Sequence, residues 1–153
     1  MFRLAVEKDF DTLRHIYSYT VTKLAPSLYS PSQVMAWSSA PDNISKFHDF
    51  IFDANTYLLI ENDEIIGFCG LKNNGYIASF YIHPHFTRQG YGTKLLCYVL
   101  DIGITQAVKK FYTEASFFSQ PVFSRCGFTI LEMETVFYGD VSFERYKMEK
   151  ITS

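Results

Sequence analysis

The stretch from Tyr81 to Leu96 limits most strictly what this chain can fold into, because a strand, a polar loop and an amphipathic helix follow one another without a spacer. The strand ends at Pro84, and the loop His85–Gly92 carries two glycines. The first amides of a helix have no partner within it, and the helix dipole is positive at that end. The sequence therefore predicts an anion site at this junction, which suits a pyrophosphate.

Two glycines in this loop favour a phosphate ligand, because a side chain at Gly90 or Gly92 would hold the phosphate away from the amides. Two better-known glycine motifs do not fit. The Gly-x-x-x-x-Gly-Lys-Ser/Thr pattern of nucleoside triphosphate sites is absent, and the dinucleotide pattern lacks its first glycine and its later acidic residue. A strand-to-helix turn whose glycines serve only close packing is the structural alternative.

The rest of the chain alternates strand and helix patterns in an order typical of one mixed domain. Apolar spacing predicts a strand over 2–6, a helix over 9–23, and a second helix that begins at the capping box Ser30-Pro31-Ser32-Gln33 and ends near Ser39. A third short helix is predicted from Asn43 to Phe52. Strands over 56–61, 65–71 and 76–83 form a predicted antiparallel meander. After the helix that opens at Gly92 we expect a strand over 110–115, a short helix over 121–126, and closing strands over 128–136 and 141–150. This order predicts an α+β fold, with residues 1–153 in a single domain.

Composition narrows the class of partner. Fourteen Lys and Arg against sixteen Asp and Glu give a net charge of −2, and no basic run forms a patch, so we expect no nucleic-acid partner. The charged segment Met1–Phe10 is unlike a signal peptide, and no stretch approaches ~18 uncharged apolar residues, so we expect a cytoplasmic protein without membrane contact. Cys69, Cys97 and Cys126 have apolar neighbours and are expected to be reduced and buried. We expect no metal site, because His83 and His85 have no third ligand nearby.

Two motifs resemble those of the GCN5-related N-acetyltransferase (GNAT) superfamily, and the resemblance spans nearly the whole chain. The strand end Tyr81-Ile82-His83-Pro84 followed by Thr87-Arg88-Gln89-Gly90-Tyr91-Gly92 is similar to the family's acetyl-CoA loop, with Thr87 in place of the first Gln or Arg and Arg88 as the neighbouring cation. The segment Pro121–Phe128 resembles the family's aromatic-rich helix that ends in Gly-Phe. The resemblance, closest to small bacterial members of unknown substrate, implies a mostly antiparallel seven-stranded sheet. It is expected to be splayed between its fourth and fifth strands and flanked by about four helices.

The resemblance also implies acetyl-CoA as cofactor and acetyl transfer to a primary amine of a small molecule by direct attack. The positions implied to contact the cofactor are Phe80, Tyr81, Ile82, Thr87, Arg88, Gln89, Gly90, Tyr91, Gly92, Thr93, Ser116 and Phe123. The amide of Ile82 is the implied oxyanion donor. Tyr29, Met35, Trp37 and Tyr138 are expected near the acceptor.

Two expected catalytic groups are missing from these motifs. Residues 76–78 offer no carboxylate to act as base, and Phe123 stands where the family often has a tyrosine acid. Glu114, on the strand over 110–115, and His83 are the substitute candidates for proton transfer. A non-catalytic acyl-CoA-binding or regulatory module on the same fold therefore stays open as the alternative. A second alternative is an interaction or regulatory protein that keeps the fold without cofactor affinity. The intact Gly90 and Gly92 argue against this second alternative. The oligomeric state is also open, a homodimer included.

Overall fold

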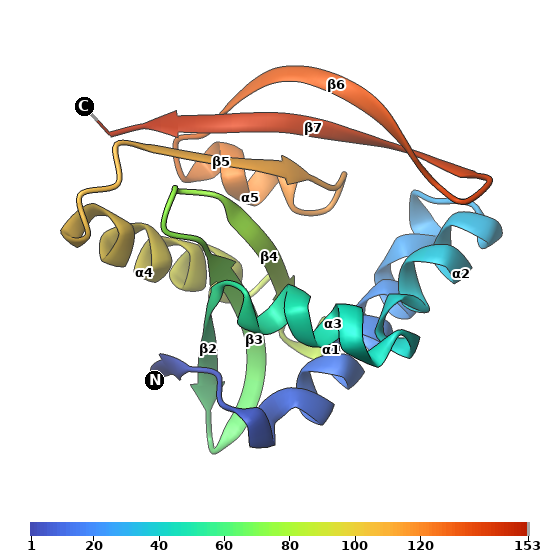
Figure 1. Cartoon of the computed structure of the whole chain (residues 1–153), viewed down its shortest axis with the longest axis horizontal. Coiled ribbons are helices and arrows are strands. Elements are labelled where there is room, and N and C mark those ends of the chain that lie inside the picture. Colours follow the sequence, from blue (N-terminus) through green and yellow to red (C-terminus); the bar gives the residue numbers. More distant parts are fainter. Residues whose placement is uncertain (153) are drawn as a thin grey trace.

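The structure is a computed structural model that describes residues 1–152, and its elements follow the predicted order (Figure 1). They are β1 (Phe2–Leu4), α1 (Phe10–Leu24), α2 (Pro31–Ser38), α3 (Ile44–Phe52), β2 (Asn55–Glu61), β3 (Glu64–Leu71), β4 (Ile77–Ile82), α4 (Tyr91–Thr105), β5 (Lys110–Ala115), α5 (Gln120–Arg125), β6 (Thr129–Tyr138) and β7 (Val141–Ile151), with short 3-10 turns between some of them. The α+β class is confirmed, with five α-helices rather than about four. None of the helices in the described part of the chain combines the length and apolar character that crossing a bilayer requires.

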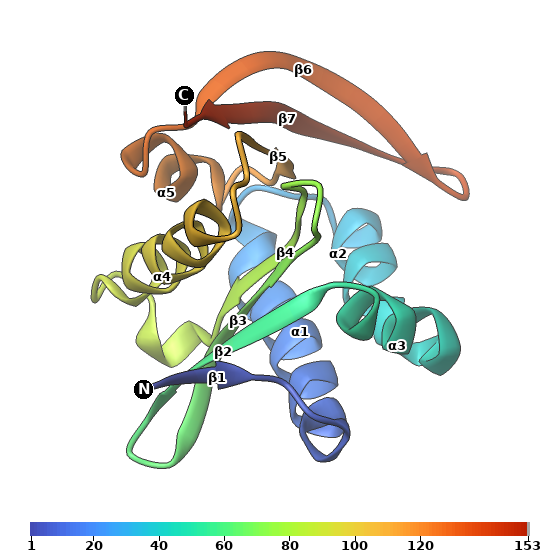
Figure 2. The ribbon, with the colours of Figure 1, turned by 60° about the vertical axis from the view of Figure 1, so that its left-hand side comes forward.

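The splay between β4 and β5 divides the strands into two sheets (Figure 2). One sheet has the order β1-β2-β3-β4 and the other β5-β7-β6, and every strand pair within them is antiparallel. A parallel bridge from Tyr76 to Tyr112 joins them at one end, where the Tyr112 amide also donates to the carbonyl oxygen of Gly75 at 3.1 Å. Beyond this closed end the edges of β4 and β5 diverge, so a ligand can lie between them.

Gly75 makes the closed end of the splay. Its φ is +94°, and a Cβ there would lie 2.0 Å from the carbonyl oxygen of Lys110, the first residue of β5. Only glycine allows the turn before β4 to approach β5 this closely. The close approach at one end fixes where the two strands begin to separate.

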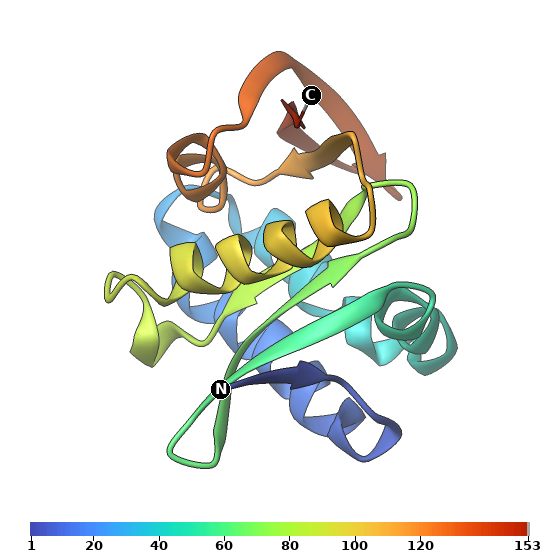
Figure 3. The same cartoon turned by 90° about the vertical axis from the view of Figure 1, so that its left-hand side faces the viewer.

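Helices cover both faces of the first sheet (Figures 2 and 3). On one face α4 buries Leu95, Leu96 and Val99 against β3, β4 and β5. On the other face α1 and α3 bury Leu13 and Ile51, with their neighbours, against β2 and β3. Because both faces are covered, the middle of β2 is buried on every residue rather than on alternate ones.

Local signals fix the first two helices. Ser30 and Gln33 form the predicted capping box: the Gln33 amide donates to Ser30 Oγ at 3.2 Å, and the Ser30 amide donates to Gln33 Oε1 at 2.8 Å. Gln33 Nε2 also donates to the carbonyl oxygen of Ser142, which ties α2 to β7. Before α1, Arg3 binds the buried carboxylate of Asp9 with two hydrogen bonds of 2.8 and 2.9 Å.

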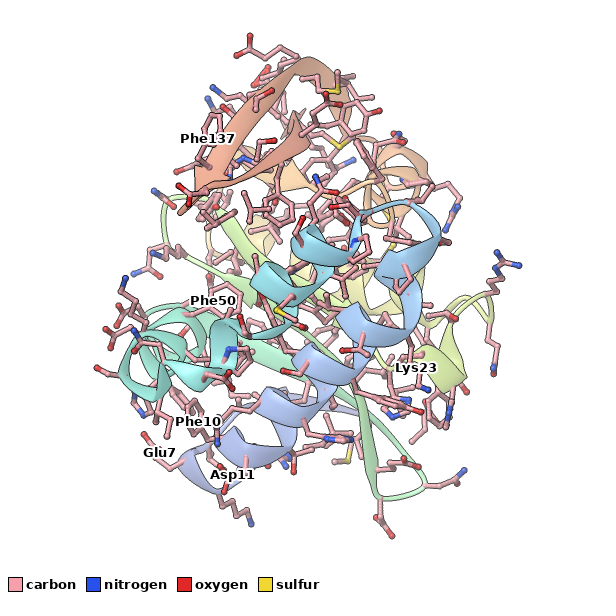
Figure 4. All side chains as sticks on the ribbon, turned by 90° about the vertical axis from the view of Figure 1, so that its right-hand side faces the viewer. Glu7, Phe10, Asp11, Lys23, Phe50 and Phe137 are labelled. Atoms are coloured by element: carbon pink, nitrogen blue, oxygen red, sulfur yellow. The ribbon has the colours of Figure 1, made fainter. Side chains whose placement is uncertain are left out.

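The outer edge of the second sheet is exposed. Among the strands of the described residues β6 pairs with β7 alone, and Phe137, near the tip of their hairpin in Figure 4, is 69% exposed. The prediction of three buried thiols is wrong for Cys97, which is exposed on α4, because it lies on the helix face opposite the buried stripe. Cys69 is buried and Cys126 is partly buried.

Candidate functional site

A cavity of about 580 Å³ runs from the N-terminus of α4 to the splay between β4 and β5. Thr87, Arg88, Gly90, Gly92 and Thr93 line its outer end. Its wall then passes along Phe80, Tyr81 and Ile82 of β4 and along Ser116 to Ser119 of the loop after β5. Residues from the end of α1 and from α5 close the remaining sides. The predicted anion loop and the open edge of β4 therefore belong to one continuous channel.

The backbone of the loop is arranged for an anion. Lys94 is the first residue of α4 whose amide donates within the helix, to the carbonyl oxygen of Gly90 at 3.1 Å. The amides of the three residues before Lys94 precede the helical hydrogen-bond ladder and stay free for a ligand. Gly90 has φ +82° and a Cβ there would meet no atom within 4 Å, so the backbone conformation and not crowding requires glycine. Arg88 also adopts a positive φ of 62°, a conformation that costs a non-glycine residue about 1–2 kcal/mol.

The amide of Ile82 faces the splay. The neighbouring amide of His83 donates across to the carbonyl oxygen of Ile66 on β3 at 2.7 Å. Successive amides along a strand point to opposite sides, so the amide of Ile82 points away from β3 and toward the gap. It is available to a ligand that lies along β4.

A second cavity, of about 280 Å³, adjoins the first one. The two share Trp37, Phe80, Tyr81, Ser116 and Ser119, and so they meet beside the open part of the splay. Aromatic rings form much of the wall of this smaller cavity, and its charged lining residues are Glu114, Glu144 and Arg145. Ser79 also lines it, and its buried Oγ has no hydrogen-bond partner among residues 1–152.

Glu114 is held in this cavity by its neighbours. Tyr76 donates its hydroxyl to Glu114 Oε1 at 2.7 Å, and Arg145 Nη1 lies 3.8 Å from the same oxygen. Burial, then the hydrogen bond to Glu114, raises the pKa of Tyr76 well above its ordinary range, so Tyr76 stays a donor at neutral pH. Within the described residues Glu114 Oε2 has no hydrogen-bond partner. One oxygen is anchored and the other is free to take a proton.

Arg145 stays charged beside this carboxylate. Burial by itself lowers the pKa of Arg145, but the hydrogen bond to Glu134 and the charges of both carboxylates raise it overall. Arg145 Nε donates to Glu134 Oε2 at 2.6 Å, on the side of β7 that faces β6. The guanidinium thus connects a carboxylate inside the cavity to one outside its lining.

Two serines stand where the cavities meet. Ser116 Oγ and Ser119 Oγ lie 3.1 Å apart, and each backbone amide donates to the hydroxyl of the other residue. Phe123, predicted to contact the cofactor, is buried between Phe80 and Phe128 and lines the smaller cavity instead of the channel. The two serine hydroxyls at the junction therefore come from the loop between β5 and α5.

The predicted site residues fall into two groups. Those that line a cavity are Tyr29, Trp37, Phe80, Tyr81, Ile82, Thr87, Arg88, Gly90, Gly92, Thr93, Glu114, Ser116, Phe123 and Tyr138. Four do not, and they are Met35, His83, Gln89 and Tyr91. Met35 is exposed on α2, Gln89 donates its side-chain amide to the carbonyl oxygen of His85, and the ring of Tyr91 lies near that of Phe86.

His83 lies outside both cavities because it follows Ile82, the last residue of β4, and so lies beyond the part of the strand that lines them. There it lies against His85 and Tyr19, at ring distances of 4.8 and 5.3 Å. Burial, followed by the charge of His85, lowers its pKa. The expectation that His83 relays a proton has no support in this geometry.

Several residues that sequence reasoning assigned no role also line the smaller cavity, and Tyr76, Ser119 and Arg145 are three of them. They come from the residue before β4, the residue before α5 and β7, and no local motif links them. A signal existed only for Ser119, which precedes a proline at the expected start of a short helix. Tyr76 and Arg145 reach Glu114 through sheet pairing, which a single sequence does not display.

Comparisons with known proteins agree with this arrangement. The profile of the acetyltransferase (GNAT) domain family matches residues 27–150. The chain is 27% identical over 128 residues to the uncharacterized N-acetyltransferase YafP of Escherichia coli K12, covering 84% of this chain and 80% of that protein. The fold is similar to a GCN5-related N-acetyltransferase from Rhodopseudomonas palustris, with a TM-score of 0.93, 22% identity, and coverage of 99% of this chain and 94% of the other.

A PaiA N-acetyltransferase from Thermoplasma acidophilum, solved in complex with coenzyme A, shares the fold with a TM-score of 0.79 and 17% identity, covering 99% of this chain and 98% of the other. The family profile alone covers most of the present chain. Together with the fold, the glycine loop and the splayed strands, the match to the family profile establishes that the chain belongs to the GNAT family of acyl-CoA-dependent acetyltransferases.

Proposed function

We propose that this acetyltransferase binds acetyl-CoA in the larger cavity and transfers the acetyl group to a primary amine of a small molecule held in the smaller one. The observation that carries the proposal is the junction of the two cavities beside the splay, at Phe80, Tyr81, Ser116 and Ser119. A donor channel and an acceptor cavity that meet at one point bring two substrates together without a covalent enzyme intermediate. This geometry supports direct attack by the amine.

The channel fits the donor by the chemistry of its lining. Free amides at the start of α4, the positive helix end and the side chain of Arg88 suit a pyrophosphate. Along β4 the unpaired edge suits the amide-bearing pantetheine arm, which can pair with it as a further strand would. When bound, acetyl-CoA supplies the thioester that the amine attacks. The Ile82 amide, which faces the gap, is the donor available to the acetyl oxygen.

Glu114 is the proposed base. An alkylammonium has a pKa near ~10, so at neutral pH a proton must leave the nitrogen before or during attack. Glu114 Oε2 is free to accept that proton, directly or through water, while Tyr76 and Arg145 hold Oε1. In the transfer the N–C bond forms, the C–S bond breaks, and the amine proton passes to the carboxylate.

The departing sulfur needs a hydrogen-bond donor, and Phe123 cannot supply one. Ser116 and Ser119 are the hydroxyls at the junction of the cavities. We assign to this pair the stabilisation of the leaving thiolate, which takes up the second proton that the nitrogen loses as the amide forms and leaves as free CoA. We also place the activity in the cytoplasm, a compartment that suits three cysteines without a disulfide.

The non-catalytic alternative is tested by measuring acetyl-CoA binding and CoA release together. Acetyl-CoA binding is followed by calorimetry, and free CoA is followed by its reaction with a thiol reagent, with a broad panel of primary amines as acceptors. The proposal expects binding, and turnover with at least one amine, that turnover being lost in Glu114→Gln. Tight binding with no amine-dependent release across the panel would instead favour an acyl-CoA-binding module.

A further inference from the structure

The size of the smaller cavity limits the acceptor. Its volume of about 280 Å³ has room for on the order of ten non-hydrogen atoms, taking ~30 Å³ for each as for water in the liquid. Phe80 and Tyr81 line both this cavity and the donor channel. The acceptor that fits inside is therefore a single small group and not a folded chain.

The part of the cavity that faces α1 to α3 is built from aromatic rings. The ring centroid of Tyr17 lies 4.6 Å from that of Tyr81 and 6.0 Å from that of Phe50. The centroids of Trp37 and Phe143 lie 6.3 Å apart. Figure 4 shows the place of Phe50 on α3. Two of these three pairs are edge-to-face, with interplanar angles of 86°. A guest ring continues such an arrangement, because aromatic rings favour tilted and offset contacts at 4.5–7 Å.

The indole N–H and two of the phenol oxygens in this part of the cavity are already hydrogen-bonded. Trp37 Nε1 donates to the hydroxyl oxygen of Tyr81 at 3.2 Å, and the Tyr29 hydroxyl accepts from the amide of Phe117 at 3.0 Å. Burial raises the pKa of Tyr81 to about 12, so it is a neutral phenol at physiological pH. This side of the cavity, which we call the aromatic wall (Tyr17, Trp37, Phe50, Tyr81 and Phe143), offers apolar surface and no charge.

The side of the cavity formed by β5 and β7 is acidic. Arg145 is bound to Glu134 at 2.6 Å and lies 3.8 Å from Glu114, so carboxylates already neutralise its charge. Glu144 also lines the cavity and has no ion-pair partner within the described part of the chain. An ammonium is attracted here, and a second carboxylate carried by the acceptor is repelled.

We propose that the acceptor is an arylalkylamine, a primary amine that carries an aromatic ring and no carboxylate. This inference rests on the proposed function, since it assigns an occupant to the acceptor cavity of that reaction. The ring lies against the aromatic wall, and the ammonium lies toward Glu114 and the junction with the donor channel. The cavity has one aromatic wall and one acidic side, which match a monoamine with one apolar and one charged end. A diamine would place one of its two charges against the aromatic wall.

The test compares four probes that separate these features: 2-phenylethylamine, phenylalanine with the same ring and an added carboxylate, butylamine without a ring, and 1,4-diaminobutane. Trp37 is the single tryptophan of the chain and lines both cavities, so its fluorescence reports binding without turnover. We expect 2-phenylethylamine to have at least a tenfold lower Kd and a tenfold higher kcat/KM than each of the other three. An equal or better value for any of them overturns the inference.

Measuring binding and turnover separately distinguishes the identity of the acceptor from the transfer reaction itself. Preferential binding of 2-phenylethylamine without CoA release would support the arylalkylamine and refute the proposed transfer reaction. Turnover of 1,4-diaminobutane or phenylalanine in preference to it would support the transfer reaction and refute the arylalkylamine. Absence of both binding and turnover with 2-phenylethylamine also refutes the inference.

Two variants examine the two sides of the cavity. Phe143→Leu removes a ring and keeps an apolar side chain, and we expect it to reduce the preference for 2-phenylethylamine over butylamine about tenfold. Glu144→Gln removes an exposed charge without disturbing the core, and we expect it to raise the relative kcat/KM of phenylalanine severalfold. Glu132→Gln, on β6 outside the cavity lining, is the matched control and should leave both preferences unchanged. Unchanged preferences in both Phe143→Leu and Glu144→Gln would overturn the inference.

Discussion

Replacing Glu114 with glutamine tests the proposed base most directly. The substitution keeps the shape of the side chain and its contact with Tyr76, but removes the group that accepts a proton at Oε2. General bases typically contribute 10²–10⁴-fold to rate. At pH 7 only about one molecule in 10³ of an alkylamine with a pKa near ~10 is unprotonated. We therefore expect kcat/KM at pH 7 to fall about 10²- to 10³-fold.

The pH dependence of that loss is the sharper measurement. Without a base the variant depends on amine that is already free in solution, so its kcat/KM should rise about tenfold for each pH unit between 7 and 9. The wild-type profile should be flatter, and the two should converge as the pH approaches the pKa of the amine. CoA release, measured with saturating acetyl-CoA from pH 6.5 to 9.5, follows both profiles.

The matched control is Glu134→Gln, which removes the same charge from the other side of Arg145. Glu134 does not line the cavity, and a partly exposed ion pair contributes up to ~1 kcal/mol, so its kcat/KM should stay within about fivefold of wild type. If both variants lose activity equally and in parallel at every pH, Glu114 acts through the charge of Arg145. The assignment of a base is then refuted.

Three further predictions concern the cofactor loop and the stability of the fold. Gly90→Glu should abolish acetyl-CoA binding in calorimetry. Gly139 on the β6–β7 turn has a similarly open position and a φ of +61°, and Gly139→Glu should retain binding. Equal losses in the two variants would mean that backbone strain and not the anion site is responsible. Ser79→Ala removes a buried hydroxyl without a partner, and urea unfolding should show the fold stabilised by about 1 kcal/mol. Thr56→Val loses a buried hydrogen bond and should destabilise the fold by about 1 kcal/mol. A destabilised Ser79→Ala would show that this hydroxyl has a partner. Asp9→Asn should lower the free energy of unfolding by about 2 kcal/mol at pH 7. Because the Arg3 hydrogen bonds hold the pKa of Asp9 below its ordinary value, the difference from wild type should disappear as the pH falls from about 4 through that lowered pKa. A constant difference down to pH 2.5 would contradict this.

The local elements could be read from the sequence because their causes are local. The capping box at Ser30 and Gln33, the apolar runs of β2 and β3 and the glycine loop before α4 each depend on residues a few positions apart. The same holds for the anion site, since the free amides belong to consecutive residues. These short-range patterns were also sufficient for the resemblance to the GNAT family, which the family profile confirms.

The lining of the smaller cavity was decided only by the tertiary structure. Glu114 could be named as a candidate, but its anchoring depends on Tyr76 across the bridge between the sheets and on Arg145 across the pairing of β5 with β7. His83 was the other candidate in the sequence, and its place beyond the end of β4 leaves it outside both cavities. Strand pairing brings together residues separated by 30 or more positions, and its register is set by packing and by the close approach at Gly75. The sequence by itself therefore determined the family and the glycine loop before α4, while the splay of the two sheets determined which side chains line the smaller cavity.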